Sequence, residues 1–334
     1  MNTGELIRVK DLQVFFHTDE GIVRAVDNVS FSVNRRETLG VLGESGCGKS
    51  VTARSLLNLI PRPRGRVHSG SIMLSKDDGT KVDILSLDPF GKEMGQIRGA
   101  EIAMIFQEPM TSLNPVYTVG QQIMEAVLLH QEVGKKVARE KAIEIMEKVG
   151  IASPQQAIDK YPHEFSGGMR QRAMIAIALS CNPRLLIADE PTTALDVTIE
   201  SQILELLHEL KAEMDMSILF ITHDLGVIGE IADRVIVMYT GKIVESGSCV
   251  DIFYRPKHPY TKKLLESRPR IGQEGELSSI VGSVPSPYHL PPGCRFAPRC
   301  DFIMEKCRQE PPIFLVGPEH QAQCWLYEGG ERVG

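Results

Sequence analysis

The sequence lacks several features that would place the protein in a membrane or on a nucleic acid. None of its apolar runs reaches the roughly 18 residues that a membrane-spanning helix needs. Its first ten residues contain no apolar stretch of the kind found in export signals. The formal net charge is −6 at pH 7, whereas nucleic-acid-binding domains are usually strongly basic. We therefore expect a cytoplasmic globular protein that binds no nucleic acid.

Cysteine is also scarce through most of the chain but not at its end. Of the seven cysteines, three are scattered singly through the body of the sequence. The other four follow residue 293, at Cys294, Cys300, Cys307 and Cys324. In a cytosolic chain, such a group favours metal binding over disulfides.

The hydrophobic pattern predicts strands and helices in alternation, with 334 residues available for two domains. We expect strands at 7–16, 25–33, 38–42, 102–106, 185–188, 218–221 and 235–238. The last three are continuous apolar runs, which is typical of buried strands in a parallel sheet. Helical periodicity covers 50–60, 119–149, 169–180 and 198–213, and the polar stretch 77–99 is expected to form a surface hairpin and loop. Periodicity fades after about residue 256, where a small C-terminal extension is expected.

A phosphate-binding loop is predicted directly after the strand at 38–42. Its motif, G-x-x-x-x-G-K-S, is matched in full by Gly43, Glu44, Ser45, Gly46, Cys47, Gly48, Lys49 and Ser50, with Val51 continuing into a helix. The glycines allow backbone N–H groups to surround phosphates, and the start of the helix adds its positive dipole end. Lys49 is expected to reach the β- and γ-phosphates, and the Ser50 hydroxyl to bind Mg²⁺.

Two carboxylates end the apolar strand at 185–188. We expect Asp189 to act in the Mg²⁺ shell and Glu190 to polarise the attacking water. A strand that ends in acids is weak evidence by itself, but together with the phosphate loop it indicates a nucleotide-hydrolysing enzyme.

A second segment suited to phosphate lies upstream of these carboxylates, at Phe165-Ser166-Gly167-Gly168-Met169-Arg170-Gln171. With these motifs in this order, the chain resembles the ATP-binding subunits of ATP-binding-cassette (ABC) transporters over about residues 5–255. The resemblance implies that Ser166, Gly167, Gly168 and Gln171 belong to the signature segment. Phe165 and Met169 depart from the common L-S-G-G-Q pattern but leave its serine and glycines in place.

The resemblance assigns further nucleotide-site residues by their positions. Gln107 matches the glutamine that approaches Mg²⁺ and the coupling surface. The triplet Ala194-Leu195-Asp196 matches the D-loop, and His223 matches the histidine that contacts the γ-phosphate. Phe16 is the expected aromatic partner of adenine, with Phe15 beside it as the alternative.

The resemblance also implies an architecture and a set of partners. The fold class is α/β, a P-loop NTPase core with a mostly parallel sheet, an antiparallel β-subdomain and a helical subdomain at about 108–182. The ATPase domain is expected at 1–256 and a Cys-rich extension at 257–334.

The signature segment should act on ATP held by a second, homologous ATPase subunit packed head to tail. Two membrane permease subunits and an extracytoplasmic peptide-binding protein complete the expected complex, which places the chain peripherally on the inner face of the membrane.

Three segments resemble the peptide branch of importers, at 108–115, 190–198 and 258–261. They favour import of di- and oligopeptides, driven by ATP hydrolysis. Because the same branch includes nickel and some oligosaccharide importers, those cargoes remain alternatives. A soluble cassette protein that acts on ribosomes or DNA is disfavoured, because the chain has neither a second cassette nor a long coiled coil.

The four C-terminal cysteines have the spacing C-x5-C-x6-C-x16-C. Four thiolates suit tetrahedral zinc or an iron–sulfur cluster, but the C-x2-4-C knuckle of structural zinc sites is absent. Resemblance to peptide-transporter subunits with a similar tail favours [4Fe–4S], with Zn²⁺ as the alternative. Phe296, Phe302 and Trp325 are expected to shield the cluster from water.

Overall fold

The computed structural model describes residues 4–107, 112–193, 196–267 and 280–333. They form two compact units: residues 34–37 and 86–221 belong to the first, and residues 5–33, 38–85 and 222–333 to the second. Throughout these described residues, we find no helix whose length and hydropathy would allow it to cross a membrane. Each unit is described by itself.

The core of the first unit is a set of three parallel strands, β6 (Ile102–Ile105), β7 (Leu185–Asp189) and β8 (Ser217–Thr222). β7 pairs with β6 on one side and with β8 on the other. Every residue of β7 and β8 is buried. This burial explains why both strands are continuously apolar rather than alternating.

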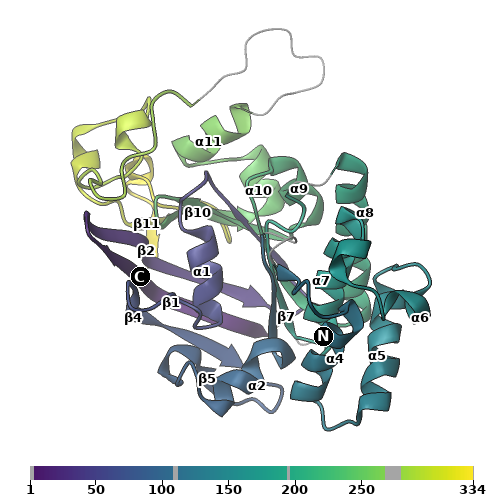
Figure 1. Cartoon of the computed structure of the whole chain (residues 1–334). Helices are drawn as coiled ribbons and strands as arrows, with labels where there is room; N and C mark the ends of the chain where they lie inside the picture. Colours follow the sequence, from purple (N-terminus) through teal and green to yellow (C-terminus); the bar gives the residue numbers. More distant parts are fainter. Residues whose placement is uncertain (1–3, 108–111, 194–195, 268–279, 334) are drawn as a thin grey trace. The chain divides into compact units, whose positions relative to one another are not determined.

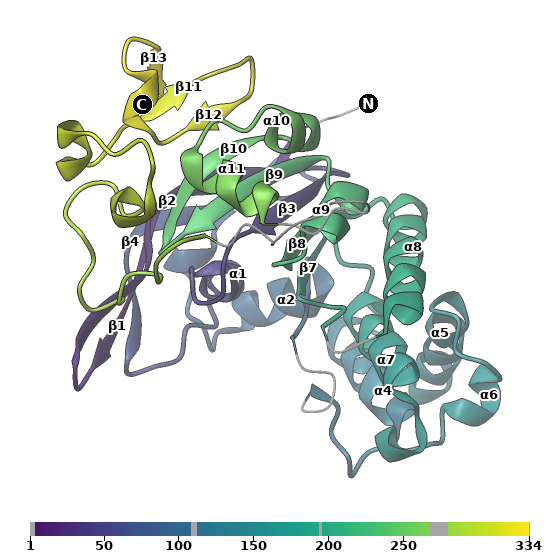
Figure 2. The ribbon, with the colours of Figure 1, turned by 90° about the horizontal axis from the view of Figure 1, so that it is seen from above.

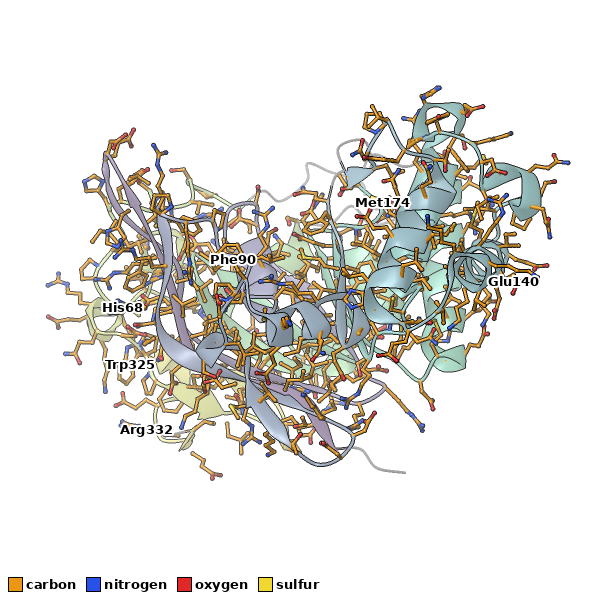
Figure 3. All side chains as sticks on the ribbon, turned by 60° about the horizontal axis from the view of Figure 1, so that its bottom comes forward. His68, Phe90, Glu140, Met174, Trp325 and Arg332 are labelled. Atoms are coloured by element: carbon orange, nitrogen blue, oxygen red, sulfur yellow. The ribbon has the colours of Figure 1, made fainter. Side chains whose placement is uncertain are left out.

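Helices make up the rest of the first unit. In chain order they are α2 (Lys92–Ala100), α4 (Val119–His130), α5 (Lys135–Lys148), α6 (Pro154–Ala157), the 3₁₀ turn Pro162–Glu164, α7 (Gly167–Leu179) and α8 (Val197–Glu213). α4, α5, α6 and α7 gather into one bundle, drawn in teal in Figure 1. Figure 3 shows Met174 on α7 within this bundle and Glu140 at its outer edge. α4 begins with a capping box, in which Thr118 and Gln121 satisfy each other's backbone N–H groups.

The second unit contains two sheets. One has the strand order β2-β1-β4-β5, built from β1 (Glu5–Thr18), β2 (Gly21–Asn34), β4 (Gly65–Ser75) and β5 (Lys81–Asp83). β1 pairs antiparallel with β4 and carries a bulge between Lys10 and Gln13. The other sheet contains the parallel pair β3 (Thr38–Leu42) and β9 (Arg234–Tyr239). β10 (Lys242–Ser248) continues it antiparallel to β9.

The C-terminal residues extend the second of these sheets. β12 (Gln321–Ala322) pairs with β10, β11 (Ile313–Leu315) pairs with β12, and β13 (Glu331–Val333) pairs with β11, all antiparallel. Figure 2 shows these strands, in yellow, beside β10. The remaining helices of the unit are α1 (Lys49–Leu56), α9 (Leu225–Ile231), α10 (Cys249–Tyr254) and α11 (Pro259–Glu266). Four 3₁₀ turns complete it, at Ile84–Ser86, Ala297–Arg299, Glu305–Arg308 and Trp325–Tyr327.

The structure confirms the predicted α/β class and corrects several local predictions. The polar stretch 77–99 does form β5 and a turn, but its last third begins the helix α2, which was not expected. The helical pattern at 119–149 is two helices, because the chain is extended at Gln131 and at Gly134. β4 was missed, since Gly65 and Gly70 interrupt its pattern.

A close approach at the start of α4 gives a test of the helical bundle. An added Cβ at Gly120 would lie 2.1 Å from Ile158 Cγ1 and 2.5 Å from the Ile158 carbonyl oxygen. We expect Gly120→Ala to lower the free energy of unfolding by about 1–3 kcal/mol, as overpacking does. The matched control is Gly134→Ala at the start of α5, where an added Cβ meets nothing within 4 Å. Denaturant titration of both variants checks this, and equal effects would contradict it.

Candidate functional site

The phosphate loop lies between β3 and α1 in the second unit. β3 is fully buried and leads directly into Gly43, and α1 begins at Lys49 with Gly48 as its N-cap. The Lys49 side chain is buried, and its Nζ donates to the carbonyl oxygens of Gly43 at 2.7 Å and Glu44 at 3.2 Å. The ammonium is thus held inside the turn that the loop makes, where the sequence predicts a phosphate-binding lysine.

Two backbone contacts fix the shape of this loop. Gly48 has φ +102°, and an added Cβ there would lie 2.2 Å from the carbonyl oxygen of Ala25. The Gly241 N–H donates to the Cys47 carbonyl at 2.8 Å. Cys47 itself is buried, and burial raises the pKa of its thiol.

Glu44 connects the loop to the C-terminal part of the chain. Its backbone N–H donates to the hydroxyl of Tyr260 at 3.0 Å. Its carboxylate accepts two hydrogen bonds from the Arg299 guanidinium, at 2.8 and 3.2 Å. Sequence reasoning missed Arg299, because no motif or spacing relates it to the loop.

In the first unit, two of the predicted catalytic side chains are in contact. Gln107 Nε2 donates to Glu190 Oε2 at 2.9 Å, and the Thr193 hydroxyl donates to the same oxygen at 3.0 Å. Glu190 follows the buried Asp189 and has φ +49°, a conformation that is uncommon outside glycine. Such a conformation costs free energy and persists only where the surrounding structure holds it. The end of β7 therefore presents two carboxylates, one of them oriented by Gln107 and Thr193.

The signature segment forms the start of α7, also in the first unit. Ser166 is the N-cap, and its hydroxyl accepts a hydrogen bond from the Met169 N–H at 3.3 Å. Gly167 and Gly168 occupy the first turn, and an added Cβ at Gly167 meets nothing within 4 Å. Gln171 is fully buried and donates to the Pro191 carbonyl at 2.5 Å. It therefore joins α7 to the segment that follows Glu190, a structural contact that sequence reasoning did not anticipate.

The other predicted nucleotide residues occupy defined places, and their roles stay predictions. Asp196 is the N-cap of α8 and accepts from the Ile199 N–H at 3.0 Å. His223 lies exposed just after β8, and Phe16 is half-buried opposite Gly65 on β4. Phe15 stacks on His68, with ring centroids 4.8 Å apart. Residues 108–111 of the extended loop and Ala194 and Leu195 of the D-loop triplet lie outside the described residues.

A second candidate site gathers the four C-terminal cysteines. Cys294, Cys300, Cys307 and Cys324 all line one small cavity. Phe296, Phe302 and Trp325, the aromatic residues proposed to shield a cluster, line it as well. Trp325 is labelled in Figure 3. The Cys294 N–H donates to the Cys307 carbonyl at 2.9 Å, which joins two of the cysteine-bearing turns.

Two of these thiols have raised pKa values. Burial, together with a smaller effect of the neighbouring thiolates, raises the pKa of Cys294 to about 11 and that of Cys324 to about 12. No group of three or more His, Cys, Asp or Glu side chains in the described part of the chain is arranged to hold a metal ion. The thiols thus share a cavity without forming the close set that one ion requires.

His258 lines the same cavity and is 1% exposed. Burial lowers the pKa of its imidazole to about 4, which keeps the ring neutral. Nδ1 accepts the Tyr260 N–H at 3.1 Å, so Nε2 carries the proton. Among the described residues, this buried Nε2 has no hydrogen-bond partner.

Comparison with family models identifies two regions of the chain. Residues 26–193 match the model described as "ABC transporter". Residues 244–307 match the model described as "Oligopeptide/dipeptide transporter, C-terminal region". The first region contains the phosphate loop, the signature segment and both carboxylates, and the second contains three of the four cysteines.

Curated relatives match over nearly the whole chain. The oligopeptide transport ATP-binding protein AppD of Bacillus subtilis (strain 168) is 50% identical over 325 residues, which cover 97% of this chain and 97% of that protein. The dipeptide transport ATP-binding protein DppD of the same organism is 49% identical over 326 residues, covering 97% of this chain and 95% of that protein.

Solved structures agree with this comparison. The dimeric ATP-binding cassette MJ0796, in a post-hydrolysis state bound to ADP and Pi, is similar with a TM-score of 0.63 and 25% identity. The match covers 73% of this chain and 99% of that chain. CbiO1 from Clostridium perfringens, part of the ABC transporter complex cbiONQ, gives a TM-score of 0.62 at 25% identity, covering 75% of this chain and 91% of that one.

The geometry at Gly48 gives a test of the phosphate loop. A methyl group at Gly48 would collide with backbone rather than with a mobile side chain, so we expect Gly48→Ala to distort the loop and abolish detectable MgATP binding. The control is Gly46→Ala in the same loop, where φ is +75° but an added Cβ meets nothing within 4 Å. Gly46→Ala should lower the free energy of unfolding by only about 1–2 kcal/mol, because alanine is less stable in the left-handed conformation, and it should still bind MgATP. Calorimetric titration with MgATP checks both, and tight binding by Gly48→Ala would contradict the expectation.

Proposed function

Because this chain belongs to the family of ABC transporter ATP-binding proteins, we propose that it energises the import of di- and oligopeptides through a membrane transporter. The chain is an ATPase of the ABC type. The observation that carries the proposed cargo is the match of residues 244–307 to a C-terminal region of oligopeptide and dipeptide transporters. Identity of 50% to the oligopeptide transport protein AppD supports the same cargo.

In the proposed mechanism, ATP is held by its phosphates and its base. The backbone of the loop from Gly43 to Ser50, with Val51, surrounds the phosphates, Lys49 contacts the β- and γ-phosphates, and Phe16 stacks on adenine. The Ser50 hydroxyl and the Asp189 carboxylate, with Gln107, would hold Mg²⁺, which neutralises phosphate charge when it is bound. Oxygen donors of this kind are the ones that Mg²⁺ prefers.

Glu190 is the proposed general base of hydrolysis. Its carboxylate polarises the attacking water and accepts its proton, while Gln107 and Thr193 keep Oε2 in a fixed direction. His223 is proposed to contact the γ-phosphate. Because the base is oriented before the reaction, little reorganisation is needed when the water attacks the γ-phosphate.

The signature segment is proposed to act on a neighbouring subunit. The N–H groups at the start of α7, around Ser166, Gly167 and Gly168, suit a phosphate. In a head-to-tail pair with a homologous ATPase, they would close on ATP held by the partner, supported by Gln171 and Asp196.

Two membrane permease subunits and an extracytoplasmic peptide-binding protein complete the proposed complex. The chain would then lie peripherally on the inner face of the membrane, with an ATPase domain at 1–256, a helical subdomain at about 108–182 and an extension at 257–334.

We also propose that the four C-terminal cysteines bind a [4Fe–4S] cluster. All four thiols line the same cavity, and their spacing lacks the C-x2-4-C knuckle of structural zinc sites, which disfavours the zinc alternative. His258 Nε2 supports the same proposal, because a buried donor without a partner is costly and cluster sulfur accepts hydrogen bonds. When bound, the cluster would join the four turns covalently and hold the extension together.

The substitution Glu190→Gln tests the proposed catalytic function. In the source organism, loss of the gene should abolish uptake of a labelled oligopeptide, and the wild-type gene should restore it. We expect Glu190→Gln to restore no uptake, because the amide cannot accept the proton. The purified variant should still bind MgATP. It should also dimerise more strongly, because ATP that is not hydrolysed stays bound between the two subunits.

The uptake assay separates the competing cargoes, and Glu205→Gln serves as the control. Glu205 lies exposed on α8 and should behave as wild type. Unchanged hydrolysis by Glu190→Gln would remove Glu190 from its role. Loss of nickel or oligosaccharide uptake with normal peptide uptake would contradict the proposed cargo.

Iron and sulfide analysis of the purified chain tests the cluster. Anaerobically purified protein should show the visible absorption of thiolate-bound iron and contain about four iron and four sulfide per chain. Cys307→Ser should lower both, whereas Cys249→Ser, outside the cavity, should not. A colourless anaerobic sample that holds one zinc per chain would refute the proposal.

A further inference from the structure

Glu44 introduces a negative charge into a loop that is expected to bind an anion. It is the one acidic residue between Gly43 and Ser50. ATP brings several negative charges to the same loop, and like charges at short range repel strongly where water is excluded. A carboxylate at this position therefore needs a fixed partner if phosphate is to bind well.

The structure supplies that partner from 255 positions further along the chain. Arg299 binds both oxygens of Glu44 and donates to the Tyr239 hydroxyl at 3.3 Å. Its remaining donors reach the carbonyl oxygens of Ile280 and Val281, at 3.4 and 3.3 Å. The Arg299 side chain is 4% exposed, whereas that of Glu44 is 29% exposed. The guanidinium is thus held by the protein, and it holds the carboxylate in turn.

Charge pairing is strong at this position. Both oxygens of the Glu44 carboxylate accept hydrogen bonds from the largely buried Arg299 guanidinium. A two-point contact between guanidinium and carboxylate fixes direction as well as charge. A lysine could not reproduce it, because an ammonium is a single point charge.

Arg299 belongs to the short segment that also carries two of the cysteines. It ends the 3₁₀ turn Ala297–Arg299, between Cys294 and Cys300. Phe296, which precedes this turn, is 1% exposed and packs against Tyr239 and Tyr260, with ring centroids 5.3 and 5.4 Å apart. Tyr260 in turn accepts the Glu44 N–H. Backbone and side chain of Glu44 are therefore both held by groups that pack on the segment 294–300.

The same segment supports the loop at a second place. Arg295 is buried and bonds to Asp27 and to the Thr240 carbonyl. Gly241, which follows Thr240 in the chain, donates its N–H to the Cys47 carbonyl of the loop at 2.8 Å. The segment 294–300 thus reaches the phosphate loop through Arg299 directly and through Arg295 by way of the turn at 240–241.

We propose that Arg299 is a positioning residue of the phosphate loop, which neutralises and orients Glu44 so that the loop binds the phosphates of ATP. Through this contact, the segment 294–300 of the C-terminal extension sets the nucleotide affinity of the ATPase. The inference rests on the proposed role of the loop in ATP binding. It assigns to the extension a function in nucleotide binding.

The test compares MgATP affinities of full-length variants by equilibrium dialysis. Arg299→Met removes the charge at similar volume and leaves Glu44 unpaired beside the loop. We expect the dissociation constant to rise by about tenfold, within the range of coupling measured for contacting residues. Adding Glu44→Gln to Arg299→Met should restore the affinity to within about threefold of wild type, because the repelling charge is gone. A residue with only a scaffolding role would give no such rescue.

The matched control is Arg139→Met, which breaks another two-point pair with a carboxylate. Arg139 binds Asp159 at 2.9 and 2.6 Å, and both side chains are largely exposed. We expect the MgATP affinity of Arg139→Met to stay within about twofold of wild type, because exposed ion pairs contribute little to stability. An equal loss in this control would show that Arg299 has no special effect and would overturn the inference.

The remaining outcomes distinguish this inference from the proposed function. If wild-type protein binds no MgATP, the proposed function itself fails. If wild type binds and Arg299→Met binds equally well, or if Glu44→Gln gives no rescue, the inference is overturned while the ATPase function stands. If Arg299→Met does not fold, Arg299→Lys decides: we expect about a threefold loss, because one ammonium cannot bridge both oxygens, and unchanged affinity would overturn the inference.

Discussion

The close approach of backbone at Gly48 is the constraint on which the nucleotide site depends. The loop must turn its N–H groups inward while the Ala25 carbonyl lies where a side chain at Gly48 would be. Only glycine has the freedom for φ +102° in that space. The buried strand β3 then enters the loop directly, and α1 begins at Lys49 in the correct direction. Gly48 thus permits the tight turn that joins β3 to α1.

Charge is the second requirement, and the chain meets it with side-chain contacts within each unit. In the first unit, Gln107 and Thr193 bind one oxygen of Glu190, whose backbone is held at an unusual angle. In the second unit, Arg299 binds Glu44. A carboxylate that does not take part in the reaction or bind the metal repels a nearby phosphate. The contacts of Glu190 orient it for the reaction, whereas the contact of Glu44 with Arg299 neutralises its charge.

The sequence predicts what depends on local residue type and misses what depends on distant contacts. Gly43, Gly48 and Lys49 could be assigned because the loop geometry permits few alternatives. The continuous apolar runs of β7 and β8 could be assigned because both faces are buried. Glycines hid the start of α2 and the strand β4, since they break a periodic pattern without breaking the element. The contact between Arg299 and Glu44 left no trace in spacing, because it joins positions 255 residues apart.

In the C-terminal extension, two of the four cysteines lie on the same short segment as Arg295 and Arg299. The strands of the extension contain only two or three residues each, so their pairing alone contributes little stability. The segment 294–300 is instead held by the packing of Phe296 against Tyr239 and by the hydrogen bond from the Cys294 N–H to the Cys307 carbonyl. Arg295 and Arg299 project from that same segment toward the phosphate loop and its supporting turn. A group that joins the cysteines would therefore also fix the arginines, and the loop's affinity for ATP would follow from the integrity of the extension.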